Sequence, residues 1–395
     1  MRIAIFSDNF YPELSGISDS LVSLARELAK RGHKIHFYVP RYSKKDHALS
    51  KFEHDEIDLG PNVAITRFSS FYFGSGSGQG RIVIPCGFRS FAVGKFNPDV
   101  IHTQTFFGVG IEALIASRLL RKPLVGTNHT AVKGFLIYNP FKSAWTDHLI
   151  VRYVNWYYSR CITVTAPSRS VFEEMDKDGF EKKGIPLSNP IDTEIFRPLA
   201  DRDALRKKLN IGNYPIIHAG RLAAERSIDV ILRALPFVQK EIPEAKLLLS
   251  GRGPAEKDLR ALAASLGIAN AVDFLGFVEQ QTLVEAYNAA RAFAITSTVD
   301  TQSMVMMQAM ACGIPVVGVR ARALPEYIND TNGFVVEPGD HVALAKRLVE
   351  ILKSEALEKK LGEGGRATTL KFSPPAVADQ WEKIYGDAIE ARKLT

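Results

Sequence analysis

The feature that most constrains the fold is a repeated alternation between short apolar runs and longer amphipathic segments. Near the N-terminus, an apolar run at residues 2–7 leads through a loop into residues 18–31, whose apolar side chains recur at helical spacing. Gly32 ends this predicted helix, and residues 33–40 form a second apolar run. A strand, a helix and another strand within about 40 residues predict a βαβ unit, in which the two strands are parallel.

The alternation continues along the chain and restarts after residues 192–198. Further predicted strands and helices lie at residues 99–104, 111–120, 123–129 and 161–166 in the first half, and at 214–219, 228–240, 246–250, 255–266, 272–275, 293–297 and 315–319 in the second half. The chain is therefore predicted to be an α/β protein with two similar halves.

These two halves define the expected domains. We predict an N-terminal Rossmann-like domain at residues 1–192, a second Rossmann-like domain at residues 193–372, and a C-terminal helix within residues 373–395 that crosses back to the first domain. Ligands of parallel sheets bind beyond the carboxyl ends of the strands, so functional residues are expected in the loops that follow them.

The composition is typical of a globular protein, with 46% hydrophobic and 24% charged residues. Cys86, Cys161 and Cys312 are far apart and form no C-x-x-C pair, so neither a disulfide framework nor a zinc site is predicted. No apolar run is long enough to span a bilayer, and polar residues at 7–9 interrupt the first one, unlike a signal peptide. We expect a cytoplasmic protein that contacts a membrane only from its surface.

The distribution of charge indicates an anionic partner. The formal net charge is +7, and residues 81–169 contain 11 basic but only 3 acidic side chains. Such a segment suits a lipid surface, a phosphorylated acceptor or nucleic acid. A basic face that is merely solvated explains the count equally well.

Cationic side chains follow a predicted strand in the second half. The segment 218–226 reads HAGRLAAER, in which Gly220 turns the chain and Arg221 and Arg226 follow. Two fixed cations at a strand end can neutralise a diphosphate leaving group. An ordinary charged surface loop is the alternative, and the position at the expected ligand-binding edge favours the functional interpretation.

The loop at residues 11–16 leaves the first strand and enters the first helix. A helix N-terminus presents N–H groups that suit a phosphate, and Gly16 lies at this point. No G-x-G-x-x-G pattern occurs, so the dinucleotide fingerprint is absent. Taken alone, Gly16 is better explained by a tight turn.

A third candidate segment reads DTQSMVMMQ at residues 300–308. Asp300 precedes a predicted helix and Gln308 lies about two turns inside it, where both can hydrogen-bond hydroxyl groups. Four of the six methionines lie at residues 304–310, and we interpret most of them as core filling. The sequence D-R-D at 201–203 imitates a metal-binding D-x-D pattern but lies in the predicted linker, where it is solvated charge.

Together these segments resemble the retaining nucleotide-sugar glycosyltransferases of family 4. The resemblance implies the GT-B fold, in which two Rossmann-like parallel-sheet domains face each other across a cleft. It covers nearly the whole chain and rests on PELSG (12–16), RGHKI (31–35), VIHTQ (100–104), GTNH (126–129), TAPS (165–168), NPID (189–192), GRLAAER (220–226), GRGP (251–254), FLGFV (274–278) and DTQSMVMMQAMACGIPVVG (300–318).

The resemblance also implies a site. The two acidic positions of the family, with seven residues between them, correspond to Asp300 at the donor sugar and Gln308 at the ribose, and its cationic pair corresponds to Arg221 and Arg226 on the donor diphosphate. His129 corresponds to a histidine near the reacting carbon and the acceptor, so the implied catalytic residues are His129, Asp300, Arg221 and Arg226. The other implied donor contacts are Gly16, Gly276, Phe277, Val278, Thr301, Gln302, Ser303 and Met304, with Gly276–Val278 at the nucleobase.

The implied mechanism retains the anomeric configuration, with donor and acceptor on the same face of the sugar. A phosphate oxygen takes the acceptor proton, and the arginines take the place of a metal, so no metal and no other cofactor are expected. The chain departs from the family pattern at four of these positions: Asp300 and Gln308 replace glutamates, Arg226 replaces lysine, and Ser303 replaces glycine. Pro190 also replaces a common glycine.

The amino-acid sequences of two segments indicate the class of acceptor. Thr301–Gln302 after the acidic position and TNHT at 127–130 resemble the branch that glycosylates diacylglycerol and related lipids. Residues 133–160 contain eight aromatic side chains and four lysines or arginines, a combination that suits a membrane interface. The alternative, which we prefer for the individual aromatic residues, is a helix that packs on its own domain with Trp145, Leu149 and Trp156 inward.

We therefore expect a hexosyltransferase that uses a nucleotide sugar, with a UDP-sugar favoured over a GDP-sugar, on a lipid or lipid-linked acceptor at the inner face of the cell membrane. One alternative is a transferase with a soluble sugar acceptor. Another is a weakly active or non-catalytic binder of nucleotide sugars, because positions 300, 303 and 308 are altered. No nucleic-acid partner is expected, since no recognition module is present.

Overall fold

A computed structural model describes the chain except for residues 14, 51–55, 73–78, 131, 133–142 and 395. The described residues form two compact units. Unit 1 comprises Met1–Pro190 together with Pro374–Thr395, and unit 2 comprises Ile191–Ser373. Each unit is an α/β domain with its own parallel sheet, which confirms the predicted fold class.

The sheet of unit 1 has seven strands in the order β3-β2-β1-β6-β7-β8-β9, and all neighbouring pairs are parallel. Its central strands are buried apolar runs, as expected where helices cover both faces of a parallel sheet. The bounds are β1 Arg2–Phe6, β2 Lys34–Pro40, β3 Val63–Phe68, β6 Val100–Thr103, β7 Leu124–Thr127, β8 Thr163–Ala166 and β9 Ile185–Pro186, with a separate antiparallel pair of β4 Phe71–Tyr72 and β5 Arg81–Ile82.

The helices of unit 1 largely follow the strands in βαβ succession. They are α1 Gly16–Lys30, α2 Lys44–Leu49, α3 Ser90–Phe96, α4 Gly108–Leu120, α6 Ala144–Ser159, α7 Arg169–Lys177 and α16 Pro374–Lys393. Helix α1 begins where the hydroxyl of Ser15 accepts a hydrogen bond from the backbone N–H of Ser18, at 3.1 Å.

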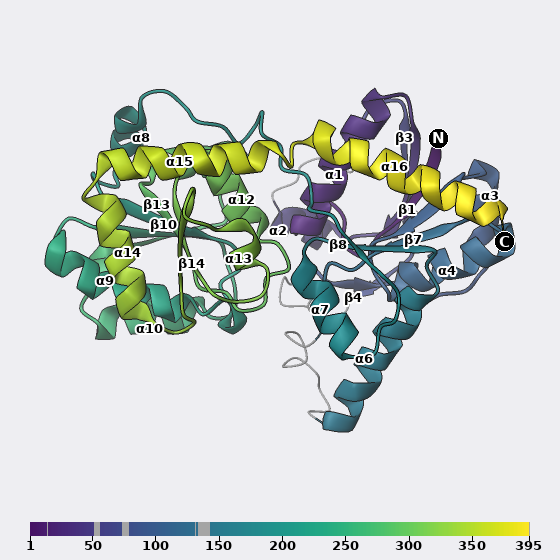
Figure 1. The fold of residues 1–395 in the computed structure, drawn as a ribbon, viewed down its shortest axis with the longest axis horizontal. Coiled ribbons are helices and arrows are strands. Elements are labelled where there is room, and N and C mark those ends of the chain that lie inside the picture. Colours follow the sequence, from purple (N-terminus) through teal and green to yellow (C-terminus); the bar gives the residue numbers. More distant parts are fainter. Residues whose placement is uncertain (14, 51–55, 73–78, 131, 133–142, 395) are drawn as a thin grey trace. The chain divides into compact units, whose positions relative to one another are not determined.

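The C-terminal helix α16 belongs to unit 1, although the chain passes through all of unit 2 before reaching it. It lies along α1 and packs against β6 and β7 (Figure 1). Its apolar face includes Trp381 and Tyr385, which are buried. On its polar face, Asp379 and Glu382 form ion pairs with Arg31 at 2.6 and 2.8 Å.

The sheet of unit 2 has six parallel strands in the order β12-β11-β10-β13-β14-β15. The bounds are β10 Pro215–Ala219, β11 Lys246–Ser250, β12 Val272–Gly276, β13 Ala292–Ile295, β14 Val316–Val319 and β15 Gly333–Val336. In this order β10 and β13 are adjacent, so the chain reverses direction across the sheet between them, and the loops after both strands lie at one edge.

Helices cover the sheet of unit 2. They are α8 Arg202–Leu209, the short helix η2 Ala224–Arg226, α9 Ile228–Glu241, α10 Glu256–Ser265, η3 Ala269–Ala271, α11 Gln280–Ala289, α12 Met304–Ala311, α13 Leu324–Tyr327, α14 His341–Leu352 and α15 Glu355–Leu370. Met306, Met307 and Met310 on α12 are fully buried in the core, as their apolar character predicts.

The D-R-D segment caps α8, where Asp201 accepts from the N–H of Ala204 and Asp203 pairs with Arg206. The sequence analysis did not predict strands β3, β9 and β15. The glycine-rich loop predicted at 74–80 falls mostly outside the described residues.

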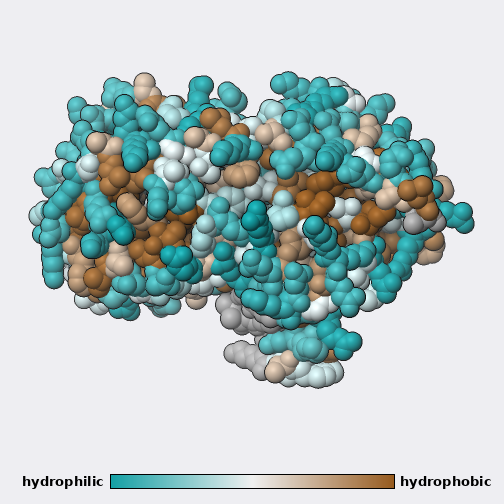
Figure 2. All heavy atoms as spheres, viewed as in Figure 1, coloured by the Kyte–Doolittle hydropathy of each residue, from teal (hydrophilic) through white to brown (hydrophobic). Residues whose placement is uncertain are grey.

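The surface of both units mixes hydrophilic and hydrophobic residues in the view of Figure 2. Among the helices that the structure describes, none combines the length and the apolar character needed to cross a membrane.

Candidate functional site

The loops after β10, β11 and β12 meet through glycines in unit 2. The Gly220 N–H donates to Ser250 O at 2.9 Å, and the Gly251 N–H donates to Gly276 O at 2.8 Å. A Cβ on Gly251 would lie 1.8 Å from Gly220 O, and one on Gly253 would lie 2.1 Å from Leu222 O. Only glycine permits this close approach of backbones, and Gly251 also has φ +134°. The three loops therefore form one rigid edge.

Both predicted cations of this edge are paired with carboxylates. Arg221 forms an ion pair with Glu225, whose side chain is buried. Arg226, the last residue of η2, donates to Asp300 Oδ1 at 2.5 Å. Sequence reasoning identified Arg221, Arg226 and Asp300 but missed Glu225, which could have been noticed from its i,i+4 spacing to Arg221.

Asp300 is held with one carboxylate oxygen unsatisfied. Its side chain is only 10% exposed. Among the described residues, the second oxygen Oδ2 is buried and has no hydrogen-bond partner. A buried acceptor without a donor costs about 1–3 kcal/mol. A ligand hydroxyl that donates to Oδ2 would remove this cost.

His218 lies at the end of β10 and, like Asp300, has a buried polar atom without a partner among the described residues. The sequence analysis did not select it as a site residue. Its Nδ1 donates to Ala294 O at 2.9 Å, which leaves the lone pair on Nε2. Burial lowers the pKa of His218 to about 4, so the ring is neutral near pH 7. Within the described part of the chain, Nε2 is buried without a partner.

The other predicted donor contacts surround the start of α12 and the end of β12. Ser303 caps α12, and its hydroxyl accepts from the Met306 N–H at 3.4 Å. Gln302, Ser303 and Gln308 are buried, while Thr301 and Met304 are half-buried. Gly276 has φ +65°, and Phe277 and Val278 follow it as half-buried loop residues. The predicted contacts of unit 2 thus lie in the loops that follow β10, β12 and β13 and in the first turns of α12.

Gly16 and His129 lie in unit 1, at the carboxyl edge of that sheet. Gly16 is the first residue of α1, after β1, and His129 follows β7. Two side chains from other parts of unit 1 donate hydrogen bonds to backbone oxygens of the loop before Gly16. Arg67 donates to Tyr11 O at 2.6 Å, and Gln79 donates to Pro12 O at 3.2 Å. The buried carboxylate of Glu13 accepts from Tyr42 at 2.8 Å.

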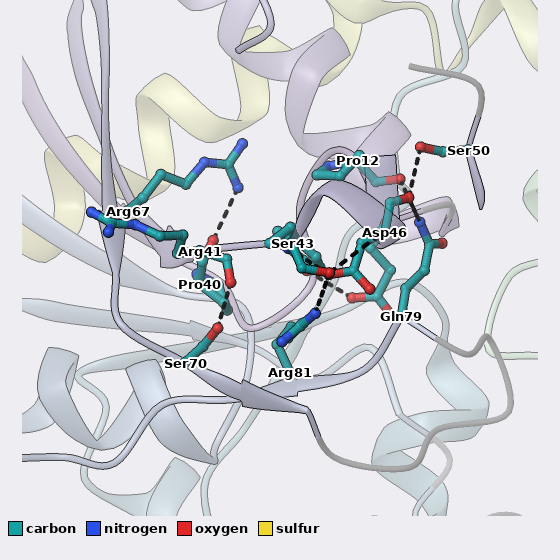
Figure 3. A network of polar contacts seen from close by, with 12 residues as sticks. Pro12, Pro40, Arg41, Ser43, Asp46, Ser50, Arg67, Ser70, Gln79 and Arg81 are labelled. Atoms are coloured by element: carbon teal, nitrogen blue, oxygen red, sulfur yellow. Dashed lines mark hydrogen bonds and ion pairs between the residues drawn. The ribbon is translucent and has the colours of Figure 1, made fainter. Parts of the chain in front are cut away.

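The residues that hold this loop belong to a wider polar network (Figure 3). Gln79 also donates to Asp46 O at 2.8 Å, and Arg81 pairs with the buried Asp46 carboxylate. Ser43 and Asp46 form a capping box at the start of α2. The network fixes α2 and the β4–β5 pair beside the loop that leads to Gly16.

His129 is a half-buried, neutral histidine. Its Nε2 lies 2.7 Å from Gln104 Oε1, and burial lowers its pKa to about 4. The sequence pattern could not reveal this contact, because Gln104 follows a different strand. No group of three or more histidine, cysteine or acidic side chains suited to a metal occurs among the described residues.

The prediction that α6 turns Trp145, Leu149 and Trp156 inward is wrong. Trp145 is 69% exposed, Trp156 is 44% exposed and Leu149 is 42% exposed. The inward face carries Val154, Tyr157 and Tyr158 instead. Helical periodicity alone allowed either face, because both are apolar. The aromatic and basic residues predicted at 133–142 lie outside the described residues.

Comparison with known proteins agrees with this architecture. The family model described as Glycosyltransferase Family 4 matches residues 14–195, and the one described as Glycosyl transferases group 1 matches residues 201–368. HepE from Anabaena, solved in complex with UDP and glucose, superposes with a TM-score of 0.75 at 20% identity, over 97% of this chain and 99% of that one. This similarity confirms the GT-B fold.

Two curated relatives align over most of the chain. Alpha-monoglucosyldiacylglycerol synthase from Streptococcus pneumoniae is 27% identical over 89% of this chain and 78% of its own length. N-acetyl-alpha-D-glucosaminyl L-malate synthase from Bacillus anthracis is 26% identical, with 97% of each chain covered. The two domains define a GT-B glycosyltransferase. The chain belongs to the family 4 glycosyltransferases and is a transferase enzyme.

Proposed function

We propose that this enzyme transfers a hexose from a nucleotide sugar to a lipid acceptor, with retention of configuration. The observation that carries the proposal is the Arg226–Asp300 pair at the carboxyl edge of the unit 2 sheet, with Asp300 Oδ2 buried and unpartnered among the described residues. This arrangement suits a donor whose diphosphate binds a cation and whose sugar hydroxyl donates to a carboxylate.

The roles of the unit 2 residues follow from their positions. Arg221 and Arg226 bind the diphosphate and stabilise the charge that develops on it as the sugar leaves. The N-terminus of α12, capped by Ser303, adds backbone N–H groups and the positive end of a helix dipole. Asp300 accepts from the sugar, Gln308 contacts the ribose, and the Gly276–Val278 turn lies against the base. These roles require no metal and no other cofactor.

In unit 1, the N–H of Gly16 binds the donor phosphates, and His129 contacts the sugar near the acceptor. A phosphate oxygen accepts the proton of the attacking hydroxyl on the same face of the sugar. UDP-glucose is the first donor to assay, because HepE has the same fold and was solved with UDP and glucose. Preference for UDP over GDP is part of the proposal.

A lipid acceptor is supported by three observations. The Streptococcus relative is named alpha-monoglucosyldiacylglycerol synthase. Trp145 and Trp156 are exposed on α6, and Arg160 lies 5.2 Å from the ring of Trp156. Residues 81–169 are strongly basic. Exposed indole rings beside cations suit the interface of an anionic membrane, so we place the reaction at the cytoplasmic membrane surface.

A soluble acceptor is the second candidate, because the Bacillus relative is named for transfer to malate. Flotation with liposomes that contain anionic lipid separates the two. We expect the wild-type enzyme to float with them, and the variant Trp145→Ser/Trp156→Ser to lose at least tenfold in binding, since each indole loses its interfacial contact. Leu370→Ser, an exposed apolar residue of unit 2, is the control and should float like wild type. Equal flotation of all three proteins would count against α6 as the contact.

The donor is tested by thermal shift against UDP-, GDP- and ADP-sugars, followed by transfer assays with diacylglycerol. A UDP-sugar at about 100 times its Kd should raise the Tm of unit 2 by roughly 5 °C, since it binds the folded state alone. The product should have the anomeric configuration of the donor, as determined by NMR. No shift and no turnover with any nucleotide sugar would reject the proposal. A large gain of turnover in Gln308→Glu would instead show that the native site is impaired.

A further inference from the structure

A continuous line of polar side chains connects the C-terminal helix to His129 inside unit 1. Tyr385 of α16 lies 2.8 Å from His102 Nδ1, through its hydroxyl. The amide nitrogen of Gln104 lies 3.1 and 2.9 Å from Nδ1 and Nε2 of the same ring. The amide oxygen of Gln104 then lies 2.7 Å from His129 Nε2.

The members of this line that precede His129 are shielded from water. His102 and Tyr385 are 0% exposed and Gln104 is 3% exposed. Trp381 of α16 covers the imidazole of His102, with ring centroids 4.4 Å apart. The Thr127 hydroxyl, 2.7 Å from His102 Nε2, fixes the ring from the side of β7. The orientation of each group is therefore set by its neighbours and not by solvent.

The nitrogen end of the Gln104 amide faces His102, and this orientation is compatible with the neutral ring. Burial lowers the pKa of His102 to about 3, so the ring is neutral near pH 7 and carries one lone pair. A lone pair attracts the N–H end of an amide, which turns the carbonyl end toward His129. The ring of His129 is also neutral, since burial lowers its pKa to about 4. A neutral ring that faces a carbonyl at Nε2 must carry its proton there.

We propose that Gln104 is a positioning residue that, oriented by His102, holds His129 as the Nε2–H tautomer and so makes Nδ1 the hydrogen-bond acceptor of the ring. The effect of this tautomer on sugar transfer rests on the proposed function, because it requires His129 to contact the sugar or the acceptor hydroxyl. The tautomer itself does not depend on that function. Through Tyr385, the C-terminal helix contributes to the same arrangement.

The tautomer is measured by long-range ¹H–¹⁵N NMR of the full-length protein labelled with ¹⁵N-histidine, with His129→Gln to assign the signal. We expect a protonated, pyrrole-type Nε2 and a pyridine-type Nδ1 in the wild-type protein at pH 7.5. Gln104→Leu removes the carbonyl and should give averaged nitrogen shifts. A wild-type proton on Nδ1, or an unchanged pattern in Gln104→Leu, would overturn the proposal. If Gln104→Leu does not fold, Gln104→Glu keeps an oxygen beside His129 and should retain the tautomer while raising the pKa of the ring.

The kinetic consequence is measured on the same proteins. Loss of one oriented hydrogen bond should lower kcat about tenfold in Gln104→Leu and leave the donor KM unchanged. Gln239→Leu is the matched control, because its amide donates a hydrogen bond to the Ala245 carbonyl of unit 2, at 3.1 Å, and its kcat should equal that of wild type. A changed tautomer with unchanged kcat would overturn the role in transfer. If no sugar is transferred by any protein, the proposed function fails while the NMR still decides the tautomer.

Discussion

Replacement of Arg226 by methionine is expected to lower kcat/KM for sugar transfer about a thousandfold and to destabilise unit 2 by about 2–3 kcal/mol. The catalytic loss arises because the guanidinium no longer binds the donor diphosphate. The loss of stability arises because the Asp300 carboxylate, 10% exposed, would remain in place without its cation. Initial rates and urea denaturation measure the two effects separately.

A double variant separates these causes. Arg226→Met/Asp300→Asn removes both charges, so most of the lost stability should return while transfer remains low. Arg320→Met is the control, because its ion pair with Glu337 joins two exposed side chains and contributes less than about 1 kcal/mol. Transfer within tenfold of wild type in Arg226→Met would contradict the assignment of this residue to the diphosphate.

Replacement of Trp381 by alanine is expected to reduce the free energy of unfolding of unit 1 by about 3–5 kcal/mol. Trp381 is 5% exposed and packs against His102 and Tyr385, so its truncation leaves a cavity beside β6 and β7. Chemical denaturation followed by circular dichroism measures the change. Deletion of residues 374–395 removes the whole apolar face of α16, and we expect this protein to aggregate.

Gln380→Ala provides the comparison for Trp381→Ala, since it is the adjacent residue on the same helix and is exposed. Its free energy of unfolding should stay within about 0.5 kcal/mol of wild type. A loss of less than 1 kcal/mol in Trp381→Ala would mean that α16 contributes little to unit 1, and it would weaken the role inferred for Tyr385.

The elements most accessible to sequence reasoning are those whose periodicity is both regular and long. Helix α16 has the bounds read from the sequence, and the expected first helix differs from α1 by only two residues at its start and one at its end. Strand β3 was not recognised, because only its last residue is buried and it lies between a loop and the short β4. An alternation of apolar and polar residues does not reveal a strand whose side chains are half-exposed on both faces.

For the candidate site, local residue types and loop positions were sufficient to select Arg221, Arg226, Asp300 and His129. They could not show that Glu225 and Asp300 neutralise the two arginines, or that His218 lies buried at the same edge. These facts depend on the directions in which side chains point after the turns. Glycines such as Gly220 and Gly251 set those directions through their backbone conformations, which the sequence pattern does not encode.

The sequence by itself determined the α/β class, the family and the loops that carry the candidate site, because these depend on the order of strands and helices and on short local segments. Only the tertiary structure decided which face of α6 exposes its tryptophans and which side chains reach His129. The physical reason is distance along the chain. His102 and Tyr385 are separated by 283 residues, and their contact exists only because α16 folds onto β6 and β7.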